Sequence, residues 1–554
     1  MLLSAVAAAP SPSSIGFVLA ALVLAFLLWH RLSRPLATMR GPRGYPLIGI
    51  GLTLPPRATE VFRQWALEYG EVFKMRVGWY NWVVINSPEA FKEILDRQVN
   101  QSHSTSSKIP APIGHDVATG NMRLFTMPYG PKWRSHRTIM HQLLSPKMTL
   151  TFVPTQEFEA KQFLYQLAFD NADQAKWAQH VRRLSFSIVM TSTYGRRIDS
   201  GDHEDLRIAA ETSKSMAKIS RPGAFIEDDF PFLAKLPHWL QPSRRAAKEH
   251  YKIIRRGKMR AWERLRAELE AGKAPPSFGR SLMESDYKSQ GLTDEDAAWI
   301  VAGLVEAGAE ITAVVIQTLI LFLAAAPEAQ ERANEELTRV VGSERLPRFE
   351  DLPDLPYVRA CVKETMRRAP VTTLSMKHFT DHEVVYKEHR IPKGTVVFAN
   401  TSFLHHDPSR YEEPFAFKPE RYLNHNRSSA EYAVAADPYQ RDHFTFGAGR
   451  RICPATRLAE NTLNIAAAHL LWAFEIRPPL EVDSEGKQVE GQVDTSEDAF
   501  EPAGGFQAPK PFRVRFVGRS PERIQLVKEQ WELAEKVGYQ LRGLTVDAEG
   551  VAAS

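Results

Sequence analysis

A long apolar segment in the second half of the chain constrains its fold more than any other feature. It reads LTDEDAAWIVAGLVEAGAEITAVVIQTLILFLAAAP over residues 292–327. Thr293 or Asp294 is a suitable N-cap, acidic residues occupy the first turn, and Pro327 ends the segment. A helix of roughly 33 residues is about 50 Å long, enough to cross a whole domain. Because it is apolar on nearly every side, we expect it to be buried.

The rest of the sequence predicts many helices and few strands. Two apolar runs on either side of a turn near Gly78 predict a hairpin over 72–87, whereas nearly all of 121–317 reads as helices joined by loops. Further helices are expected over 327–342, 357–370 and 456–474, with short strands over 382–403. The predicted fold class is therefore mainly α with small β-sheets (α+β).

The N-terminal region departs from this soluble pattern. Residues 15–29 are apolar and uncharged, and basic residues follow at Arg31, Arg34, Arg40 and Arg43. Spanning a bilayer takes roughly 17–25 residues, so the run is slightly short. A cleavable signal would have basic residues before it and a small-residue cleavage site after it, and neither is present. We predict an uncleaved membrane anchor with the body of the protein on the cytoplasmic side; a cleaved signal and a soluble hydrophobic tail are the alternatives.

These patterns divide the chain into four parts. Residues 1–30 form the anchor, a proline-rich linker covers 31–58, and one catalytic domain covers 59–518. Residues 519–554 form a C-terminal extension without an assigned function. The extension contains an amphipathic helix, whose predicted apolar face consists of Ile524, Val527, Trp531, Ala534 and Val537.

Charge and cysteine content exclude some functions. The formal net charge is only +5, and there is no basic run with interleaved aromatic residues, so we expect no nucleic-acid partner. The chain has two cysteines, Cys361 and Cys453, which excludes a disulfide framework and fits a reducing compartment. Cys361 falls in the middle of a predicted helix and is expected to be a core residue.

Cys453 has a different setting, in the stretch FGAGRRICPA at 446–455. Glycines before it allow a sharp turn with inward backbone N–H groups, two arginines add positive charge, and Pro454 can begin a helix. All three features stabilise a thiolate. A buried structural thiol is the plain alternative. A dinucleotide-binding turn is a weaker one, because a third glycine and a following acidic residue are missing.

The same stretch resembles the haem-binding loop of the cytochrome P450 monooxygenases, of the microsomal, fungal type that acts in specialised metabolism. The resemblance implies a cytochrome P450 fold with a b-type haem, iron protoporphyrin IX, whose metal is bound by the Cys453 thiolate. The cofactor-binding residues that the loop implies are Phe446, Gly447, Gly449, Arg451 and Cys453.

Other motifs of this family occur in the expected order. KETMR resembles the family's Glu-x-x-Arg helix and PERY its partner element, which implies a structural triad of Glu364, Arg367 and Arg421. KWRSHR resembles a helix that covers the haem, so Trp133 and Arg137 would face its propionates, and His378 matches a further propionate contact. The resemblance extends from the anchor to about Phe516.

The long helix departs from the family at one position. The family usually has Ala-Gly-x-Asp/Glu-Thr-Thr/Ser, and here AGAEIT places Ile311 where the oxygen-activating threonine is expected. Thr312 lies about 100° further round an ideal helix and could replace it only if the helix is locally overwound or bulged. Glu310 and Thr312 are the predicted catalytic proton relay. Gly308 is expected to leave space for dioxygen.

The function implied by the resemblance is insertion of one oxygen atom from O2 into a hydrophobic small molecule, an intermediate of secondary metabolite biosynthesis. Electrons would come from NADPH through NADPH-cytochrome P450 reductase, with cytochrome b5 as a further partner, at the endoplasmic reticulum membrane. Ile311 keeps open a haem-thiolate isomerase, dehydratase or peroxide-dependent enzyme that needs no O2 activation. A membrane-tethered haem sensor is the non-enzymatic alternative.

Overall fold

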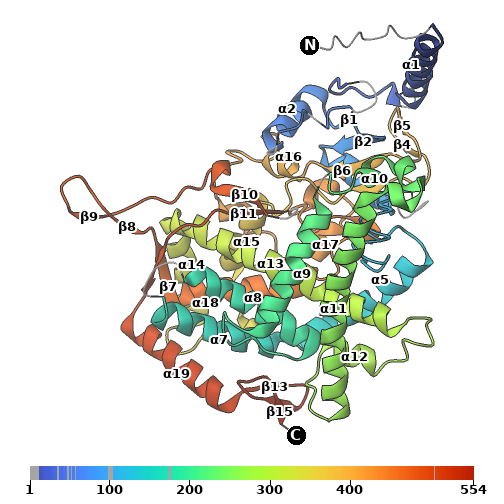
Figure 1. Cartoon of the computed structure of the whole chain (residues 1–554). Coiled ribbons are helices and arrows are strands. Elements are labelled where there is room, and N and C mark those ends of the chain that lie inside the picture. The colour runs from blue at the N-terminus through green and yellow to red at the C-terminus, as the bar shows by residue number, and fades with distance from the viewer. Residues whose placement is uncertain are drawn as a thin grey trace, which may run out of the picture.

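One helix, α13 (Asp294–Ala324), runs through the middle of the molecule (Figure 1). Its start is fixed by a capping box, in which Thr293 and Asp296 each bind the other's backbone N–H. The helix is 31 residues long, and most of its residues from Asp296 to Ala324 are buried. The predicted long, buried helix is thus confirmed.

The computed structural model describes residues 12–33, 36–45, 49–51, 53–55, 58–97, 104–171, 176–221, 223–503 and 506–553. The α-helices besides α13 are α1 (Pro12–Ser33), α2 (Thr59–Tyr69), α3 (Pro88–Lys92), α5 (Pro131–Leu143), α6 (Pro146–Leu150), α7 (Val153–Phe169), α8 (Trp177–Tyr194), α9 (Glu204–Ser220), α10 (Ile226–Asp229), α11 (Pro242–Glu270), α12 (Phe278–Met283), α14 (Pro327–Val340), α15 (Pro356–Arg368), α16 (Thr401–His406), α17 (Ser429–Ala433), α18 (Thr456–Ala473) and α19 (Pro521–Val537). Short 3-10 helices are η3 (Pro231–Lys235), η4 (His238–Leu240), η5 (Phe349–Asp354), η6 (Pro419–Tyr422), η7 (Pro438–Gln440), η8 (Gly449–Arg451) and η9 (Glu497–Ala499), and η2 (Glu93–Arg97) is a π-helix.

The strands form small sheets beside this helical body. They are β1 (Val72–Val77), β2 (Tyr80–Ile85), β3 (His378–Phe379), β4 (Val384–Tyr386), β5 (His389–Ile391), β6 (Val396–Ala399), β7 (Phe474–Arg477), β8 (Leu480–Val482), β9 (Gln488–Glu490), β10 (Phe500–Ala503), β11 (Phe506–Pro509), β12 (Arg515–Gly518), β13 (Tyr539–Leu541), β14 (Leu544–Val546) and β15 (Ala552–Ala553). The largest sheet has the order β1-β2-β6-β3, and the predicted hairpin is its β1–β2 pair. The mainly α fold class with small sheets is confirmed.

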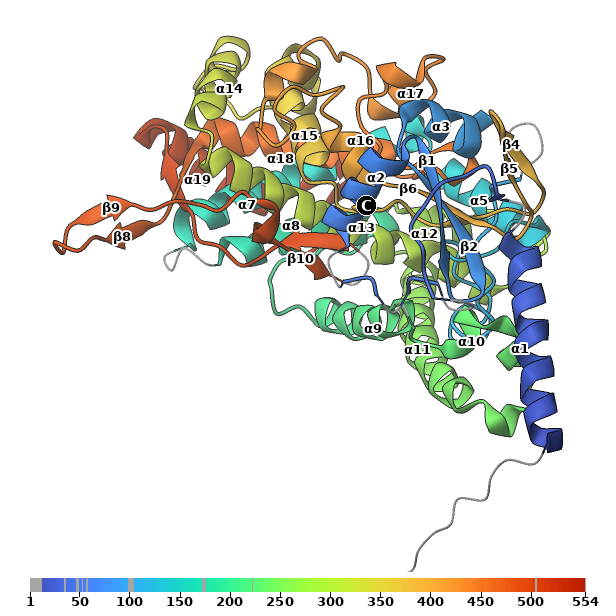
Figure 2. The ribbon, with the colours of Figure 1, turned by 90° about the horizontal axis from the view of Figure 1, so that it is seen from above.

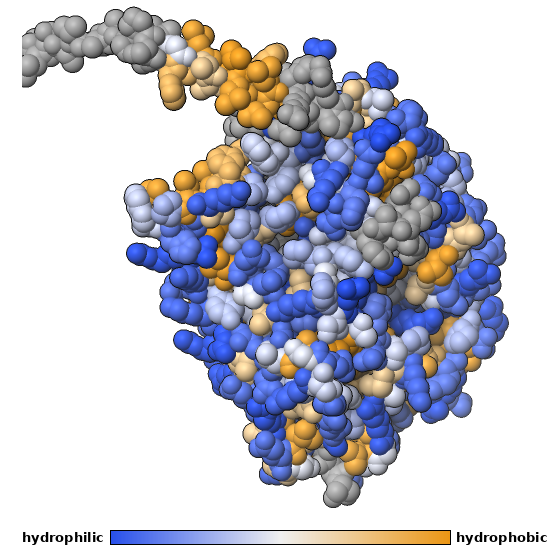
Figure 3. All heavy atoms as spheres, turned by 90° about the vertical axis from the view of Figure 1, so that its right-hand side faces the viewer, coloured by the Kyte–Doolittle hydropathy of each residue, from blue (hydrophilic) through white to orange (hydrophobic). Residues whose placement is uncertain are grey.

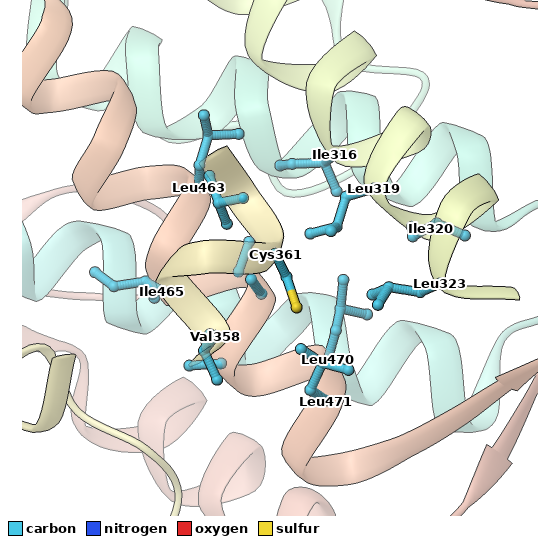
Figure 4. Packing of buried hydrophobic residues seen from close by; sticks show 14 of the residues in the cluster. Ile316, Leu319, Ile320, Leu323, Val358, Cys361, Leu463, Ile465, Leu470 and Leu471 are labelled. Atoms are coloured by element: carbon cyan, nitrogen blue, oxygen red, sulfur yellow. The ribbon is translucent and has the colours of Figure 1, made fainter. Parts of the chain in front are cut away.

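The main core lies where α13 meets α7, α8, α15 and α18. Figure 4 shows part of this core, with the sulfur of Cys361 of α15 among leucine and isoleucine side chains of α13 and α18. Cys361 is fully buried, as its place in the middle of α15 predicted. Burial raises the pKa of its thiol well above the ordinary value, so this cysteine stays protonated.

The two ends of the chain are placed differently. Helix α1 projects from the body (Figure 2), and its apolar side chains stand clear of a mostly hydrophilic surface (Figure 3). Among the described residues, α13 alone is long and apolar enough to cross a membrane, but 78% of its most apolar stretch is buried inside the protein. The apolar stretch of α1, Gly16–Leu28, is shorter. Residues 1–11 of the predicted anchor, and 34–35, 46–48, 52 and 56–57 of the predicted linker, lie outside the described residues.

The C-terminal extension packs against the domain. Helix α19 contacts α7 and α18, and the sheet β13-β14-β15 follows it. Val527, Trp531 and Ala534 of the predicted apolar face are buried, but Val537 is exposed because the helix ends there and Gly538 follows. In contrast, the hairpin β8–β9 projects away from the body (Figure 1).

Candidate active site

The loop before Cys453 is held by two glycines and a short helix. Gly447 and Gly449 have positive φ angles of 73° and 57°, a conformation that residues with a side chain rarely adopt. A Cβ atom on Gly449 would lie 2.3 Å from the carbonyl oxygen of Leu95, so glycine is also required by the close approach of η2. The Cys453 N–H donates to the carbonyl of Phe446 at 2.8 Å and closes the turn.

Cys453 itself lies deep in the domain and yet retains accessible surface. Burial raises the pKa of its thiol, while a backbone N–H at Ala455, the charge of Arg137 and the hydroxyl of Thr456 act in the opposite direction. Helix α18 begins at Thr456, three residues after the cysteine, so Pro454 precedes the helix and does not form its first turn. The sulfur therefore lies near a helix N-terminus.

Buried cations surround the backbone next to this loop. Arg137 of α5 donates to the Ile452 carbonyl, and the Arg451 guanidinium lies 4.2 Å above the Trp133 ring. His378 of β3 contacts the Thr105 carbonyl through Nδ1 at 2.7 Å. The structure also adds Lys108, whose Nζ donates to the Lys377 carbonyl at 2.8 Å. The sequence analysis assigned no role to Lys108, because a lone lysine in a loop carries no motif.

Among the described residues these cations have little counter-charge, and Asp381 acts on Arg451 only from beyond ion-pair distance. Within the described residues, none of the ion pairs involves Lys108, Arg137 or Arg451. Burial and Arg137 lower the pKa of Arg451 to about 9, and burial together with Arg451 lowers the pKa of Lys108 well below its ordinary value. Burial, Lys108 and Arg451 also lower the pKa of His378 well below its ordinary value. Such shifts arise where like charges are buried together.

This arrangement fits a haem. The two propionates of a haem would neutralise the buried cations, and Cys453, which is not fully buried, would bind its iron. Trp133, Arg137, His378, Arg451 and Lys108 are the residues that would hold the propionates. Gly447 meets no atom within 4 Å of where its Cβ would be, so the loop also leaves open space there.

Part of α13 is open in the middle of an otherwise buried helix. Ala307, Glu310 and Ile311 are exposed, with Ile311 retaining 37% of its accessible surface. Helix α18 packs on α13, which brings the element after Cys453 to this helix. We call Ala307, Glu310 and Ile311 the open stripe of α13. Glu310 Oε1 lies 3.6 Å from Arg182 Nε of α8.

Thr312 lies outside the open stripe. It is 8% exposed, and α13 is an uninterrupted α-helix from Asp294 to Ala324 without the bulge that would turn Thr312 into the place of Ile311. Gly308 does not face the open stripe either, because a Cβ there would lie 3.3 Å from Val189 of α8. The expectation that Gly308 leaves space for dioxygen is thus wrong; its small size lets two helices pack closely.

The structure brings the predicted triad together. Both carboxylate oxygens of Glu364 bind Arg367, at 2.7 and 2.8 Å, and both side chains are fully buried. Arg421 of η6 is 3.4 Å from Glu364. Arg367 also donates to the carbonyls of His405 and Pro414, so it connects α15 to the loops that precede η6.

A second buried ion pair holds the segment that leads into the cysteine loop. Lys363 of α15 binds Asp442 at 2.7 Å, and the Ser429 hydroxyl donates to the same carboxylate at 2.6 Å. Asp442 comes four residues before Phe446 and is fully buried. The sequence analysis missed this pair because the two residues are 79 positions apart. The only sequence feature that pointed to this pair was the lysine directly before the Glu-x-x-Arg motif.

Comparisons with known proteins agree with this arrangement. The family model described as Cytochrome P450 matches residues 39–495. The chain is 51% identical over 97% of its length to cytochrome P450 monooxygenase pgmC of Aspergillus terreus, covering 96% of that protein. It is 34% identical to cytochrome P450 monooxygenase verL of Clonostachys rogersoniana, with 93% of each chain covered. A zebrafish cytochrome P450 solved with abiraterone has a TM-score of 0.62 at 22% identity, covering 84% of this chain and all of that one, which shows the shared fold.

Proposed function

The chain belongs to the cytochrome P450 family of monooxygenases, and from this premise we propose that it inserts one oxygen atom of O2 into a hydrophobic small molecule. The observation that carries the proposal is Cys453, which lies in a glycine-rich turn next to Arg137 and near the buried Arg451 and Lys108. Fungal relatives named as monooxygenases support an intermediate of secondary metabolism as the substrate.

A thiolate-ligated haem supplies the activation of dioxygen when it is bound. The chain's own contribution begins with holding that group. Cys453 would bind the iron, while Arg137, Arg451, Lys108 and His378 would bind the propionates. The glycine-rich turn and Phe446 would keep the sulfur in place, with the triad and the Lys363–Asp442 pair holding the surrounding loops.

The chain must also deliver protons to the reacting oxygen. Glu310 fits this role because its carboxylate is half-exposed on the open stripe and lies within reach of Arg182. A proton can pass from solvent to a Glu310 oxygen and be held there on the open stripe. Thr312 offers a hydroxyl two residues further on, but its burial favours Glu310 as the group that carries the proton.

Electron supply and location complete the proposal. The sequence has no flavin or nicotinamide motif, so NADPH-cytochrome P450 reductase, or cytochrome b5 for one electron, would be the donor. The apolar helix α1 supports attachment to the endoplasmic reticulum membrane with the domain on the cytoplasmic side. Exposed apolar residues of α10, η3 and η4, namely Ile226, Phe232 and Trp239, would face the same membrane.

Spectroscopy of the reduced, carbon monoxide-bound protein tests the central assignment. Wild-type protein should give the absorption band of a thiolate-ligated haem, and Cys453→Ala should lose it. Cys361→Ala is the matched control, since Cys361 is buried in the core and should leave the band unchanged. A thiolate band that persists in Cys453→Ala would overturn the proposal.

Ile311 on the open stripe favours a second candidate, a haem-thiolate isomerase, dehydratase or peroxide-dependent enzyme. Such chemistry needs no hydroxyl beside the activated oxygen. Incubation under oxygen-18 gas with NADPH and reductase separates the two. Heavy oxygen in the product supports the monooxygenase, whereas product formed without reductase or O2 supports the alternative.

A further inference from the structure

Three charged side chains from distant parts of the chain meet near the open stripe. Glu306 of α13 binds Arg123 through Oε1, with distances of 2.7 Å to Nε and 2.6 Å to Nη2. Its other oxygen, Oε2, binds Lys258 Nζ of α11 at 2.9 Å. The exposed fractions of the side chains are 16% for Glu306 and Arg123 and 4% for Lys258. We call these three residues the Glu306 cluster.

The Glu306 cluster carries an excess positive charge. Burial would raise the pKa of Glu306, but Arg123 and Lys258 outweigh it and lower the pKa to about 2, so the carboxylate is ionised at neutral pH. Two cations therefore share one anion. Their other contacts are neutral: Arg123 donates to the Ser220 hydroxyl at 3.2 Å, and Lys258 lies 4.8 Å from the Trp299 ring. A buried charge without a partner is costly.

The cluster also borders the place where a substrate would lie. Glu306 precedes Ala307 of the open stripe, and it is five residues, or about 7.5 Å along the helix axis, from Ile311. Arg123 lies 5.2 Å from the ring of Phe125, which keeps 47% of its surface exposed. A cationic group and an aromatic face thus occur together at one end of the open stripe.

We propose that the Glu306 cluster is a subsite for an anionic group on the substrate, a carboxylate or an ionised phenol. The inference rests on the proposed function, because it assigns the substrate class of the same site. The anion binds the free N–H groups of Arg123 and completes the charge balance, while the apolar part of the molecule lies along the open stripe toward Ile311. Glu306 holds the two cations in position, and its negative charge lowers their affinity for the substrate's anionic group enough to allow release of the product.

Binding of acids and their neutral counterparts tests this subsite. The probes are 2-naphthoate against methyl 2-naphthoate, 2-naphthol against 2-methoxynaphthalene, and decanoate against methyl decanoate. Dissociation constants come from the spin-state change of the oxidised holoprotein and from equilibrium dialysis. In wild type, at least one acid should bind about tenfold more tightly than its neutral counterpart. The phenol and carboxylate arms then identify which anion is preferred.

Substitutions of Arg123 and of Glu306 should change the affinity for the acid in opposite directions. Arg123→Met should abolish the preference for the acid, and Arg123→Lys should retain part of it. Glu306→Gln should increase the affinity for the acid and leave that for the ester unchanged, because both cations lose their shared anion. Lys252→Met is the control, since Lys252 is an exposed cation on α11 that pairs with Glu249, outside the Glu306 cluster.

Two results would overturn the inference. One is that no acid binds more tightly than its neutral counterpart, including the case in which neither binds. The other is that Arg123→Met keeps the wild-type preference, which would leave the Glu306 cluster as a purely structural contact. The carbon monoxide spectrum of each sample reports on the haem ligand and does not depend on either binding result. Loss of the thiolate band in wild type would defeat the proposed function, whereas equal binding with an intact band defeats only the subsite.

Discussion

Glu310 and Thr312 are two positions apart on α13, and the helix turns them to different surroundings. The Glu310 carboxylate lies on the open stripe, close to Arg182 of α8, whereas the Thr312 side chain is buried. Chemistry that needs a mobile proton is therefore assigned to Glu310.

Kinetics can separate these two residues. Glu310→Gln should lower product formation by roughly 10²-fold or more, because an amide cannot release a proton. Thr312→Val should stay near wild type. Product and hydrogen peroxide are measured per NADPH oxidised. A Thr312→Val protein that releases mostly peroxide, beside an active Glu310→Gln, would reverse the assignment.

The acid sensitivity of the fold can be followed at His469 of α18. This ring is 1% exposed, and burial lowers its pKa to about 4, against about 6.5 for an exposed histidine. Below the higher value the unfolded chain binds a proton that the folded chain does not, so stability is lost as the pH falls from about 6.5 toward 4.

The expected loss from His469 is on the order of 2 kcal/mol between neutral pH and pH 5. Urea unfolding at both pH values measures it. His469→Gln should be less stable at neutral pH, since the smaller, non-planar side chain fills the buried site less well and its bond to the Ile465 carbonyl changes, but its stability should depend less on pH. Equal pH dependence in the two proteins would contradict the shifted pKa.

At the residue scale, sequence reasoning succeeded where a motif concentrates several residues in a short stretch. Cys453, with its glycines and arginines, is such a case. Lys108 and the Lys363–Asp442 pair could not be found in this way, because their roles arise from chain segments that meet only in the folded molecule. The Glu306 cluster has the same origin.

At the scale of elements, α19 shows how the C-terminal extension is attached. Trp531 is 4% exposed, and its ring lies 5.5 Å from that of Phe158 in α7 and 5.5 Å from the Arg197 guanidinium. Arg197 in turn binds the buried carboxylate of Glu159 at 2.8 Å. The helix therefore covers a charged network that would otherwise be open to water.

Truncation of this side chain should destabilise the domain strongly. Trp531→Ala should cost about 3–5 kcal/mol in the free energy of unfolding, the usual effect of removing a buried aromatic ring. Leu533→Ala, on the exposed side of the same helix, should change it by less than about 0.5 kcal/mol. Chemical denaturation measures both. Equal effects would mean that α19 is not docked as described.

Long elements with clear signals were predictable, and short ones were not. The limits of α13 followed from its N-cap and from Pro327, and α14, α15 and α18 were found from their apolar periodicity. The π-helix η2 and the strands β13 to β15 were missed because they contain few residues and depend on partners elsewhere. The bulge suggested for α13 was not found, since packing against α8 at Gly308 is compatible with a regular helix.

At the scale of the whole molecule, the anchor and the domain should be separable. Helix α1 stands outside the core, and its described side chains are largely exposed. Deleting residues 1–33 should leave the thiolate carbon monoxide band intact and move the protein from the membrane fraction to a salt-sensitive or soluble one. Fractionation in high salt, with an α1-only fusion as the control, measures this. A deletion variant that remains an integral membrane protein would show that another segment anchors it.

The docking of α19 and the β13–β15 sheet has a consequence for biosynthesis. Residues that close over α7 follow the entire haem-binding region in the chain, so they leave the ribosome after it. During translation Phe158 and the Glu159 network remain uncovered until α19 has been made. The surface of α7 in the nascent domain therefore stays exposed to water until α19 docks on it. Cellular chaperones can bind this surface during that interval.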